Sequence, residues 1–429
     1  MNGQTSEAST TQQPRASVIL TLSLIPLIMV LGNSMLVPIL PEAKSALNIS
    51  QLQVSLLITL FSIPAGIVIP LAGILSDRFG RKKVIIPSLI IYGTGGIVAG
   101  IAAWIGDGSY ALLLTGRVIQ GIGAAGTAPI AMALVGDLYD RQSRSKALGI
   151  IEAANGMGKV LSPILGSIIA VISWFALFFA FPILCVPAAI LVWLLIQEPG
   201  KQQEPPPLKR YKEQLVNTWK SQGKWLLAAF LSGAVTLFIL FGVLFYLSDI
   251  LEATYKIDGV KKGLVLAIPL LALSGTSYWC GGFVQKRIKL MKPFIVSGLG
   301  TLAVTMGVVP FVKNTIILIV LLVLSGIGSG LILPCLNTMI TSSVGKEERG
   351  IVTSLYNSVR FTGVALGPPV FGAFMDAKTA LFLSVAGIAA ISFVVALLFI
   401  KRPQRIRSKR GHERTFVHKK KLRPRIQNP

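Results

Sequence analysis

Long apolar runs, each long enough to cross a membrane as a helix, recur along nearly the whole chain and constrain its fold more than any other feature. A bilayer core of about 30 Å needs roughly 20 apolar residues per helix. Hydrophobic residues make up 53% of the chain and charged residues only 14%, which is not typical of a soluble domain. The sequence therefore predicts an all-α membrane protein with twelve transmembrane helices. The predicted spans are 17–40, 52–75, 84–104, 110–135, 146–170, 172–196, 225–247, 263–284, 294–312, 315–340, 351–375 and 379–400.

Positive charge is concentrated in alternate loops. The chain has 41 Lys and Arg residues against 17 Asp and Glu, and a formal net charge of +24. Most of these cations lie before the first span, after even-numbered spans and in the tail, which by the positive-inside rule places both termini in the cytoplasm. This distribution argues against nucleic acid as the partner of the positive charge. The localisation expected is a multi-pass protein of the cytoplasmic (cell) membrane.

The chain repeats itself at an offset of 205 residues. This offset aligns "GIGAAGTAP" (121–129) with "GIGSGLILP" (326–334), and also "GKVLSPILGS" (158–167) with "GVALGPPVFG" (363–372). Two parallel six-helix repeats are the plan of transporters that move two halves about a central site. The expected organisation is a cytoplasmic N-terminus (1–16), a first six-helix half (17–199), a cytoplasmic linker (200–224), a second half (225–402) and a basic cytoplasmic tail (403–429). The tail could bind anionic lipid headgroups or serve only as a disordered topology signal.

Four motifs resemble signatures of the major facilitator superfamily. "GILSDRFGRKK" (73–83) resembles the pattern between spans 2 and 3, "LGNSMLVPILP" (31–41) that of span 1, and "LLTGRVIQGIGAA" (113–125) that of span 4. "GKVLSPILGS" resembles the span 5 motif of drug:proton antiporters, with Ser162 and Ser167 in place of glycines. The antiporter-motif residues are Gly158, Ser162, Pro163 and Gly166. The resemblance implies the pseudo-symmetric major facilitator fold, and it favours the twelve-span branch of proton-coupled exporters.

The cationic loop after span 2 is expected to do more than fix topology. Gly80 allows the sharp turn between two antiparallel helices, and a glycine at 73 lets a neighbouring helix approach closely. Resemblance to the family assigns Asp77 to a latch that holds the outward-facing state. A plain topogenic cluster is the alternative. The predicted latch residues are Gly73, Asp77, Arg78, Gly80 and Arg81.

Polar residues inside the spans are the candidates for substrate and proton chemistry, because such residues are costly in lipid and usually face the interior. Glu152, Asn155, Lys159 and Ser162 are three or four residues apart and share one face of span 5. The alternative for this stripe is a structural ion pair that only locks helices together. We predict proton coupling through Glu152 and Arg117. The predicted cavity residues are Asn33, Gln120, Asn155, Lys159, Asn357 and Arg360.

The inventory of side chains argues against an enzyme. Both histidines, His412 and His418, lie in the basic tail, so the spans offer no histidine base and no metal site. "GIGAAG" lacks the Lys and Ser/Thr of a phosphate-binding loop, so no cofactor is expected and the proton gradient is the energy source.

The expected function is proton-coupled efflux of small amphipathic organic molecules, which means multidrug or drug export, by alternating access in a protein acting as a monomer. Arg117, Lys159 and Arg360 outnumber Glu152 inside the spans, which favours anionic or neutral substrates over lipophilic cations. The alternatives are a dedicated exporter of an anionic metabolite, such as a catecholate siderophore, and a lipid flippase on the same fold.

Overall fold

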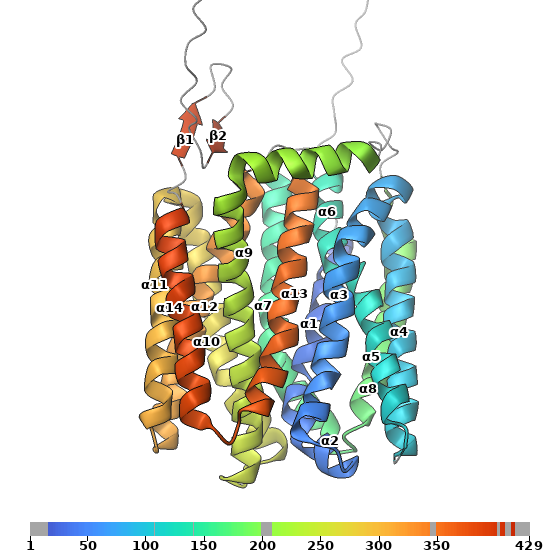
Figure 1. Cartoon of the computed structure of the whole chain (residues 1–429). Coiled ribbons are helices and arrows are strands. Elements are labelled where there is room, and N and C mark those ends of the chain that lie inside the picture. Colours follow the sequence, from blue (N-terminus) through green and yellow to red (C-terminus); the bar gives the residue numbers. More distant parts are fainter. Residues whose placement is uncertain are drawn as a thin grey trace, which may run out of the picture.

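The structure is a computed structural model that describes residues 16–106, 108–139, 141–198, 208–343, 349–400, 404–407 and 413–416. Its long helices stand side by side in one bundle (Figure 1). The predicted N-terminal segment, residues 1–16, lies outside the described residues except for Ala16, where the first helix begins.

The first half of the chain contains eight α-helices and one short 3-10 helix in the described ranges. Their bounds are α1 (Ala16–Ser34), η1 (Val37–Ile39), α2 (Leu40–Ala46), α3 (Gln51–Phe79), α4 (Arg81–Ile105), α5 (Tyr110–Ala125), α6 (Ala128–Leu138), α7 (Arg141–Ala170) and α8 (Ala176–Leu195). Local sequence explains the ends of α3. Ser50 caps its start, because the Ser50 hydroxyl accepts from the Gln53 N–H and the Gln53 side chain accepts from the Ser50 N–H. Gly80, with φ of +109°, ends it and turns the chain into α4.

The second half contains six α-helices, two short 3-10 helices and a β-hairpin in the described ranges. Their bounds are α9 (Leu208–Ala253), α10 (Gly259–Lys286), η2 (Ile288–Leu290), α11 (Met291–Val308), η3 (Val309–Phe311), α12 (Thr315–Ser343), α13 (Arg349–Ala373), α14 (Lys378–Phe399), β1 (Gln404–Arg407) and β2 (Glu413–Phe416). The antiparallel hairpin lies beyond the upper end of the bundle in Figure 1. It occupies part of the predicted basic tail, and the rest of that tail lies outside the described residues.

Ten helical segments among the described residues are long and apolar enough to cross a membrane. The remaining two predicted spans correspond to α7 and α13, which contain 30 and 25 residues and run through the bundle beside the others (Figure 1). At 1.5 Å per residue they are about 45 and 37 Å long, enough for a bilayer core of about 30 Å. Their Glu, Lys, Arg and Asn residues lower their hydropathy. The prediction of twelve spans is confirmed for ten, and α7 and α13 have the length expected of the other two.

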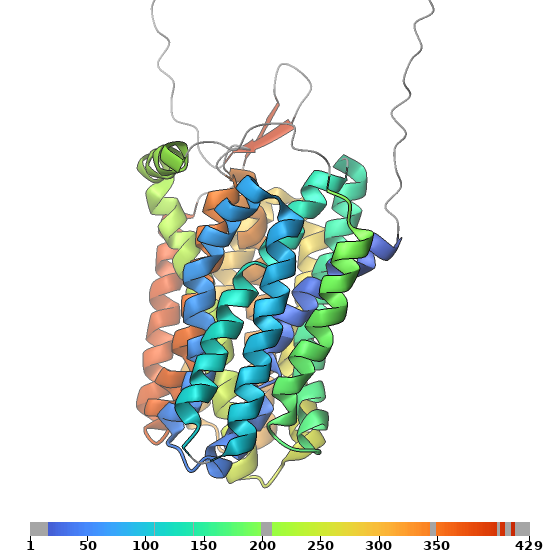
Figure 2. The same cartoon turned by 90° about the vertical axis from the view of Figure 1, so that its right-hand side faces the viewer.

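The predicted linker, residues 200–224, overlaps the start of α9. This helix begins at Leu208 and continues to Ala253, and the part long and apolar enough to cross a membrane begins at Gln222. Its first part lies across the upper end of the bundle and its second part turns into the bundle (Figure 1), so that the first part is seen end-on in Figure 2. The polar composition of 208–221 excluded it from a span but did not exclude a helix at the surface.

The two halves contact each other along α3 and α13 and along α7 and α10. Where α3 and α13 run side by side, the Thr59 hydroxyl donates to the Ala365 carbonyl at 2.7 Å. Near the lower end Gln51 Nε2 donates to Asp249 Oδ1 at 3.1 Å, and near the upper end Gly73 lies against the Ser354 side chain. The halves therefore touch near both ends of α3 in this conformation.

Candidate functional site

The polar stripe of α7 points away from the surface expected to face lipid. Glu152, Asn155 and Lys159 lie within about 60° of one another on the helix, since each residue turns the helix by about 100°. The large apolar side chains exposed along the other side of α7 are Met157, Leu161, Leu165 and Ile168.

The neighbours of α7 show where the stripe faces. Gly158 packs toward Val30 of α1, and Gly156 accepts a hydrogen bond from Ser274 of α10 at 3.0 Å. The polar side chains lie on the part of α7 between these two contacts. We infer from these contacts that they face the interior of the bundle.

Glu152 and Lys159 lie on this inner face without close partners. Glu152 is exposed and Lys159 is half-buried, so accessible space lies beside them inside the bundle. Lys159 is within electrostatic range of Glu152. In the part of the chain that the structure describes, neither side chain forms a hydrogen bond or ion pair. The locking ion pair that the sequence left open is therefore not formed in this conformation.

Arg360 of α13 brings a second cation to the interior, also within electrostatic range of Lys159. Its guanidinium NH1 lies 3.4 Å from the Oδ1 atoms of both Asn337 and Asn357. Its Cζ lies 5.3 Å from the centre of the Tyr356 ring, which is within the range of a cation–π contact. No carboxylate of the described residues forms an ion pair with it. Asn337 and Tyr356 were not predicted, although Tyr356 stands one helical turn before Arg360 in the sequence.

Arg117 of α5 is enclosed instead of facing open space. Its side chain is 0% exposed and lies 4.7 Å from the Phe61 ring centre. Four oxygen atoms accept hydrogen bonds from it. They are the carbonyl oxygens of Leu57 (2.8 Å) and Gly32 (3.2 Å) and the side-chain oxygens of Gln120 (2.6 Å) and Asn33 (2.9 Å).

This enclosure changes how three of the predicted residues are understood. Arg117, Asn33 and Gln120 are all buried and bonded to one another, so they contribute almost no surface to a cavity in this conformation. Arg117 also forms no ion pair with Glu152. The charged groups that face the interior are therefore Lys159 and Arg360 against Glu152, and the excess is one positive charge instead of two.

The predicted latch residues form a polar cluster at the upper end of the bundle. Arg81 NH1 pairs with Asp77 at 2.6 Å, and its Nε pairs with Asp137 of α6 at 3.1 Å. The Arg81 backbone N–H donates to Glu198, which follows α8. Asp137 and Glu198 were missed by sequence reasoning, because they are 56 and 117 residues away from Arg81.

Asp77, Asp137 and Glu198, which contact Arg81, belong to the first half. Gly73 of this motif lies against the second half, where an added Cβ would lie 3.1 Å from Ser354 Oγ of α13. Gly80 supplies the turn through its positive φ, as predicted. The role of this cluster as a latch stays a prediction.

The antiporter motif places α7 tightly against α1. Gly166 lies so close to α1's end that an added Cβ would be 2.2 Å from the Met35 carbonyl oxygen. Pro163 lies inside α7, and its carbonyl faces Gly263 of α10. Gly158 has more room, with its nearest neighbour atoms on Val30 at 3.6 Å.

We expect Gly166→Ala to disturb the packing of α7 far more than Gly158→Ala. A methyl group at 166 must displace a backbone carbonyl, at a cost of about 1–3 kcal/mol for overpacking, whereas one at 158 makes ordinary van der Waals contact. Thermal unfolding of the purified protein should therefore begin several degrees lower for Gly166→Ala. Equal melting temperatures for the two variants would contradict the close approach of α7 to Met35.

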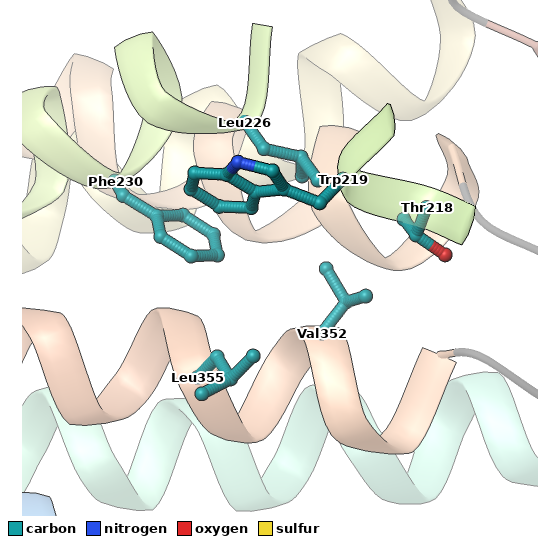
Figure 3. Close-up of a pocket in the computed structure, with 6 residues that line it drawn as sticks. All are labelled: Thr218, Trp219, Leu226, Phe230, Val352 and Leu355. Atoms are coloured by element: carbon teal, nitrogen blue, oxygen red, sulfur yellow. The ribbon is translucent and has the colours of Figure 1, made fainter. Parts of the chain in front are cut away.

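A small apolar pocket lies apart from the polar face, where the two parts of α9 meet α13 (Figure 3). Phe230 in its wall contacts Tyr356, with ring centres 5.9 Å apart. The pocket holds no charged side chain. It is lined by Thr218, Trp219, Leu226, Phe230, Val352 and Leu355.

Two sets of membrane-crossing helices that meet around a polar, charged interior define a multi-pass membrane transporter. The family model of the Major Facilitator Superfamily matches residues 22–368 and 292–427. The chain therefore belongs to the Major Facilitator Superfamily, a family of transporters and not of enzymes. In the part of the chain that the structure describes, no three His, Cys, Asp or Glu residues cluster as metal ligands would.

The chain is similar to known exporters over most of its length. It is 45% identical over 385 residues to the Bacillibactin exporter of Bacillus subtilis (strain 168). The matched region covers 89% of this chain and 96% of that protein. It is 27% identical over 389 residues to the Multidrug efflux protein YfmO of the same organism, covering 89% and 92% of the two chains. The crystal structure of a D-xylose–proton symporter has the same fold, with a TM-score of 0.72, 14% identity and coverage of 90% of this chain and 98% of that one.

Proposed function

We propose that this transporter exports small anionic amphipathic molecules from the cell in exchange for protons, and that bacillibactin is the first substrate to test. The name of the relative at 45% identity supports this choice, because that protein is a bacillibactin exporter. The proposal follows the expectation of a dedicated exporter of an anionic metabolite such as a catecholate siderophore.

One observation carries the proposal. Lys159 and Arg360 reach the interior from different halves, within electrostatic range of each other, and neither has a carboxylate partner among the described residues. With Glu152 counted, the interior carries one excess positive charge, and uncompensated charge at this depth is unfavourable unless another group neutralises it. A substrate carrying negative charge provides that neutralisation and a lipophilic cation opposes it.

Glu152 is the proposed proton carrier. It is the carboxylate on the inner face of α7 and has no bonded partner in the described structure. A carboxyl group that meets cations in one facing state and apolar surroundings in the other can release a proton in the first and take one up in the second, because a nearby cation favours the charged form and burial disfavours it. We propose that this switch between facing states couples the movement of protons to the export of substrate.

The orientation proposed places both termini, and hence the cationic upper end of the bundle, in the cytoplasm. Arg78, Arg81, Lys82 and Lys83 all lie at the turn between α3 and α4 at this end, which agrees with the positive-inside rule. We propose that the protein works as a monomer, since one chain provides both halves, and that the basic tail meets anionic lipid at the same membrane face.

Multidrug efflux is the second candidate, and relatives such as YfmO favour it. Broad efflux of cations requires that Lys159 and Arg360 be neutralised by protein groups during the cycle. The two candidates therefore differ in how transport depends on these two side chains.

Lys159→Gln and Arg360→Gln are expected to lower transport of bacillibactin by about tenfold or more each. A hydrogen bond to a charged group is worth about 1.5–3 kcal/mol, and 1.4 kcal/mol is a factor of ten. Uptake into inverted membrane vesicles at low substrate concentration measures the loss, with ethidium as a cationic probe. Lys313→Gln is the matched control, because Lys313 is exposed in the loop before α12. Strong ethidium uptake, with bacillibactin uptake unaffected by either variant, would favour multidrug efflux.

A further inference from the structure

The guanidinium of Arg360 has hydrogen-bond partners on one edge and none on the other. NH1 points to the amide oxygens of Asn337 and Asn357, both at 3.4 Å, while the ring of Tyr356 supports its face at 5.3 Å. The Nε atom is buried and has no hydrogen-bond partner, and no bond joins NH2 to any described residue. The Nε–NH2 edge therefore donates no hydrogen bond to the described residues, and its Nε atom is covered in this conformation.

Buried N–H groups in folded proteins nearly always have a partner. The unsatisfied Nε therefore indicates a partner from outside the protein, which reaches this atom in a facing state that uncovers it. The Nε–NH2 edge donates two parallel hydrogen bonds and matches two oxygen atoms that lie side by side, which a single ammonium group such as that of Lys159 cannot do.

We propose that the Nε–NH2 edge of Arg360 binds two adjacent oxygens of the substrate, such as those of a catecholate, and that Asn337 and Tyr356 are positioning residues that aim this edge. This inference rests on the proposed export of anions and adds the geometry by which the substrate is recognised. Lys159 supplies charge to the same interior, whereas Arg360 supplies the selection for paired oxygens.

The position of Arg360 supports a fixed edge. An added Cβ at Gly233 of α9 would lie 3.2 Å from Arg360 Cγ and 2.7 Å from the Tyr356 ring, so the stem of Arg360 and the ring are packed against α9. Asn357 is on the same helix as Arg360, whereas Asn337 reaches it from α12. A guanidinium held by three elements loses little freedom on binding, which strengthens its preference for one ligand geometry.

The test compares a tris-catecholate with its tris-phenolate analogue, which lacks one hydroxyl group on each ring. Arg360→Lys keeps the positive charge and removes the fork. We expect wild-type vesicles to transport the tris-catecholate about tenfold better at low concentration, and Arg360→Lys to remove this preference while still transporting the phenolate. Arg287→Lys is the matched control, because Arg287 also stacks on an aromatic ring, that of Phe283 at 5.2 Å, but lies at the end of α10.

Asn337→Ala provides a second test that leaves Arg360 in place. We expect it to reduce the preference for the catecholate by several-fold without lowering phenolate transport, a change in ratio that a general loss of folded protein does not produce. If the Arg360→Lys protein does not accumulate in the membrane, Asn337→Ala alone tests the paired-oxygen site.

The outcomes separate this inference from the proposed function. Equal transport of both probes by the wild type, or an equal loss of both in Arg360→Lys and Asn337→Ala, overturns the paired-oxygen site and leaves anion export standing. Failure of the wild type to transport either probe overturns both proposals.

Discussion

Replacement of Glu152 by Gln is expected to abolish transport driven by a pH gradient, while the protein remains folded in the membrane. Gln has nearly the shape of Glu but cannot bind and release a proton, and Glu152 is the carboxylate on the interior face of α7. Its lack of a bonded partner among the described residues means that the change breaks no structural ion pair. Substrate uptake into inverted vesicles, with and without an imposed pH gradient, measures the effect.

Substrate exchange without a gradient gives the control for this prediction. Glu152→Gln should still exchange labelled for unlabelled substrate, because binding and movement of the halves do not need the proton carrier. Glu213→Gln, at an exposed position of α9, should behave as the wild type in both assays. Gradient-driven uptake that survives Glu152→Gln at the wild-type rate would remove Glu152 from proton coupling.

Arg117→Met is expected to destabilise the first half strongly instead of altering coupling alone. The change leaves four buried oxygen acceptors around an apolar side chain, those of Leu57, Gly32, Gln120 and Asn33. A buried acceptor left without its donor costs about 1–3 kcal/mol, so losing several should sharply reduce the yield and melting temperature of the purified protein.

Arg360→Met serves as the comparison, because the same substitution removes only two long hydrogen bonds from a half-buried side chain. Arg360→Met should lower the stability of the protein much less than Arg117→Met does. Its main effect should be a loss of transport. A stable Arg117→Met protein that binds substrate but has lost proton coupling would instead support the role for Arg117 that the sequence motif predicts.

The sequence predicted the helical architecture because membrane helices leave a strong local signal. Runs of about 20 apolar residues need no knowledge of distant contacts to be recognised. The same signal is weakest in α7 and α13, where Glu152, Lys159 and Arg360 interrupt the apolar runs. Both helices were still predicted from their apolar runs, and the 205-residue repeat aligns a segment of one with a segment of the other.

The inner face could be predicted only in part. The spacing of Glu152, Asn155 and Lys159 placed them on one side of a helix, and the structure turns that side inward. The contacts of a side chain cannot be predicted from spacing in this way, because they depend on which helices pack together. Nothing near Arg117 in the sequence indicates the carbonyl oxygens of Leu57 and Gly32, so an enclosed arginine could not be distinguished from one that lines a cavity.

Partners distant in the chain also explain the remaining differences. Asn337 reaches Arg360 from another helix, and Glu198 meets the turn at Gly80 only because α8 ends beside the start of α4. The helical start of α9 at Leu208 was missed because a polar surface helix carries no hydropathy signal of a span.

Uptake of bacillibactin by inverted vesicles containing only this transporter tests the central proposal most directly. The vesicles are loaded so that their interior is acidic, and bacillibactin and ethidium are offered in parallel at equal concentration. We expect bacillibactin to accumulate, its accumulation to stop when the pH gradient is dissipated, and ethidium to accumulate much less. Accumulation of ethidium but not of bacillibactin under the same gradient would rule out the proposed export of anions.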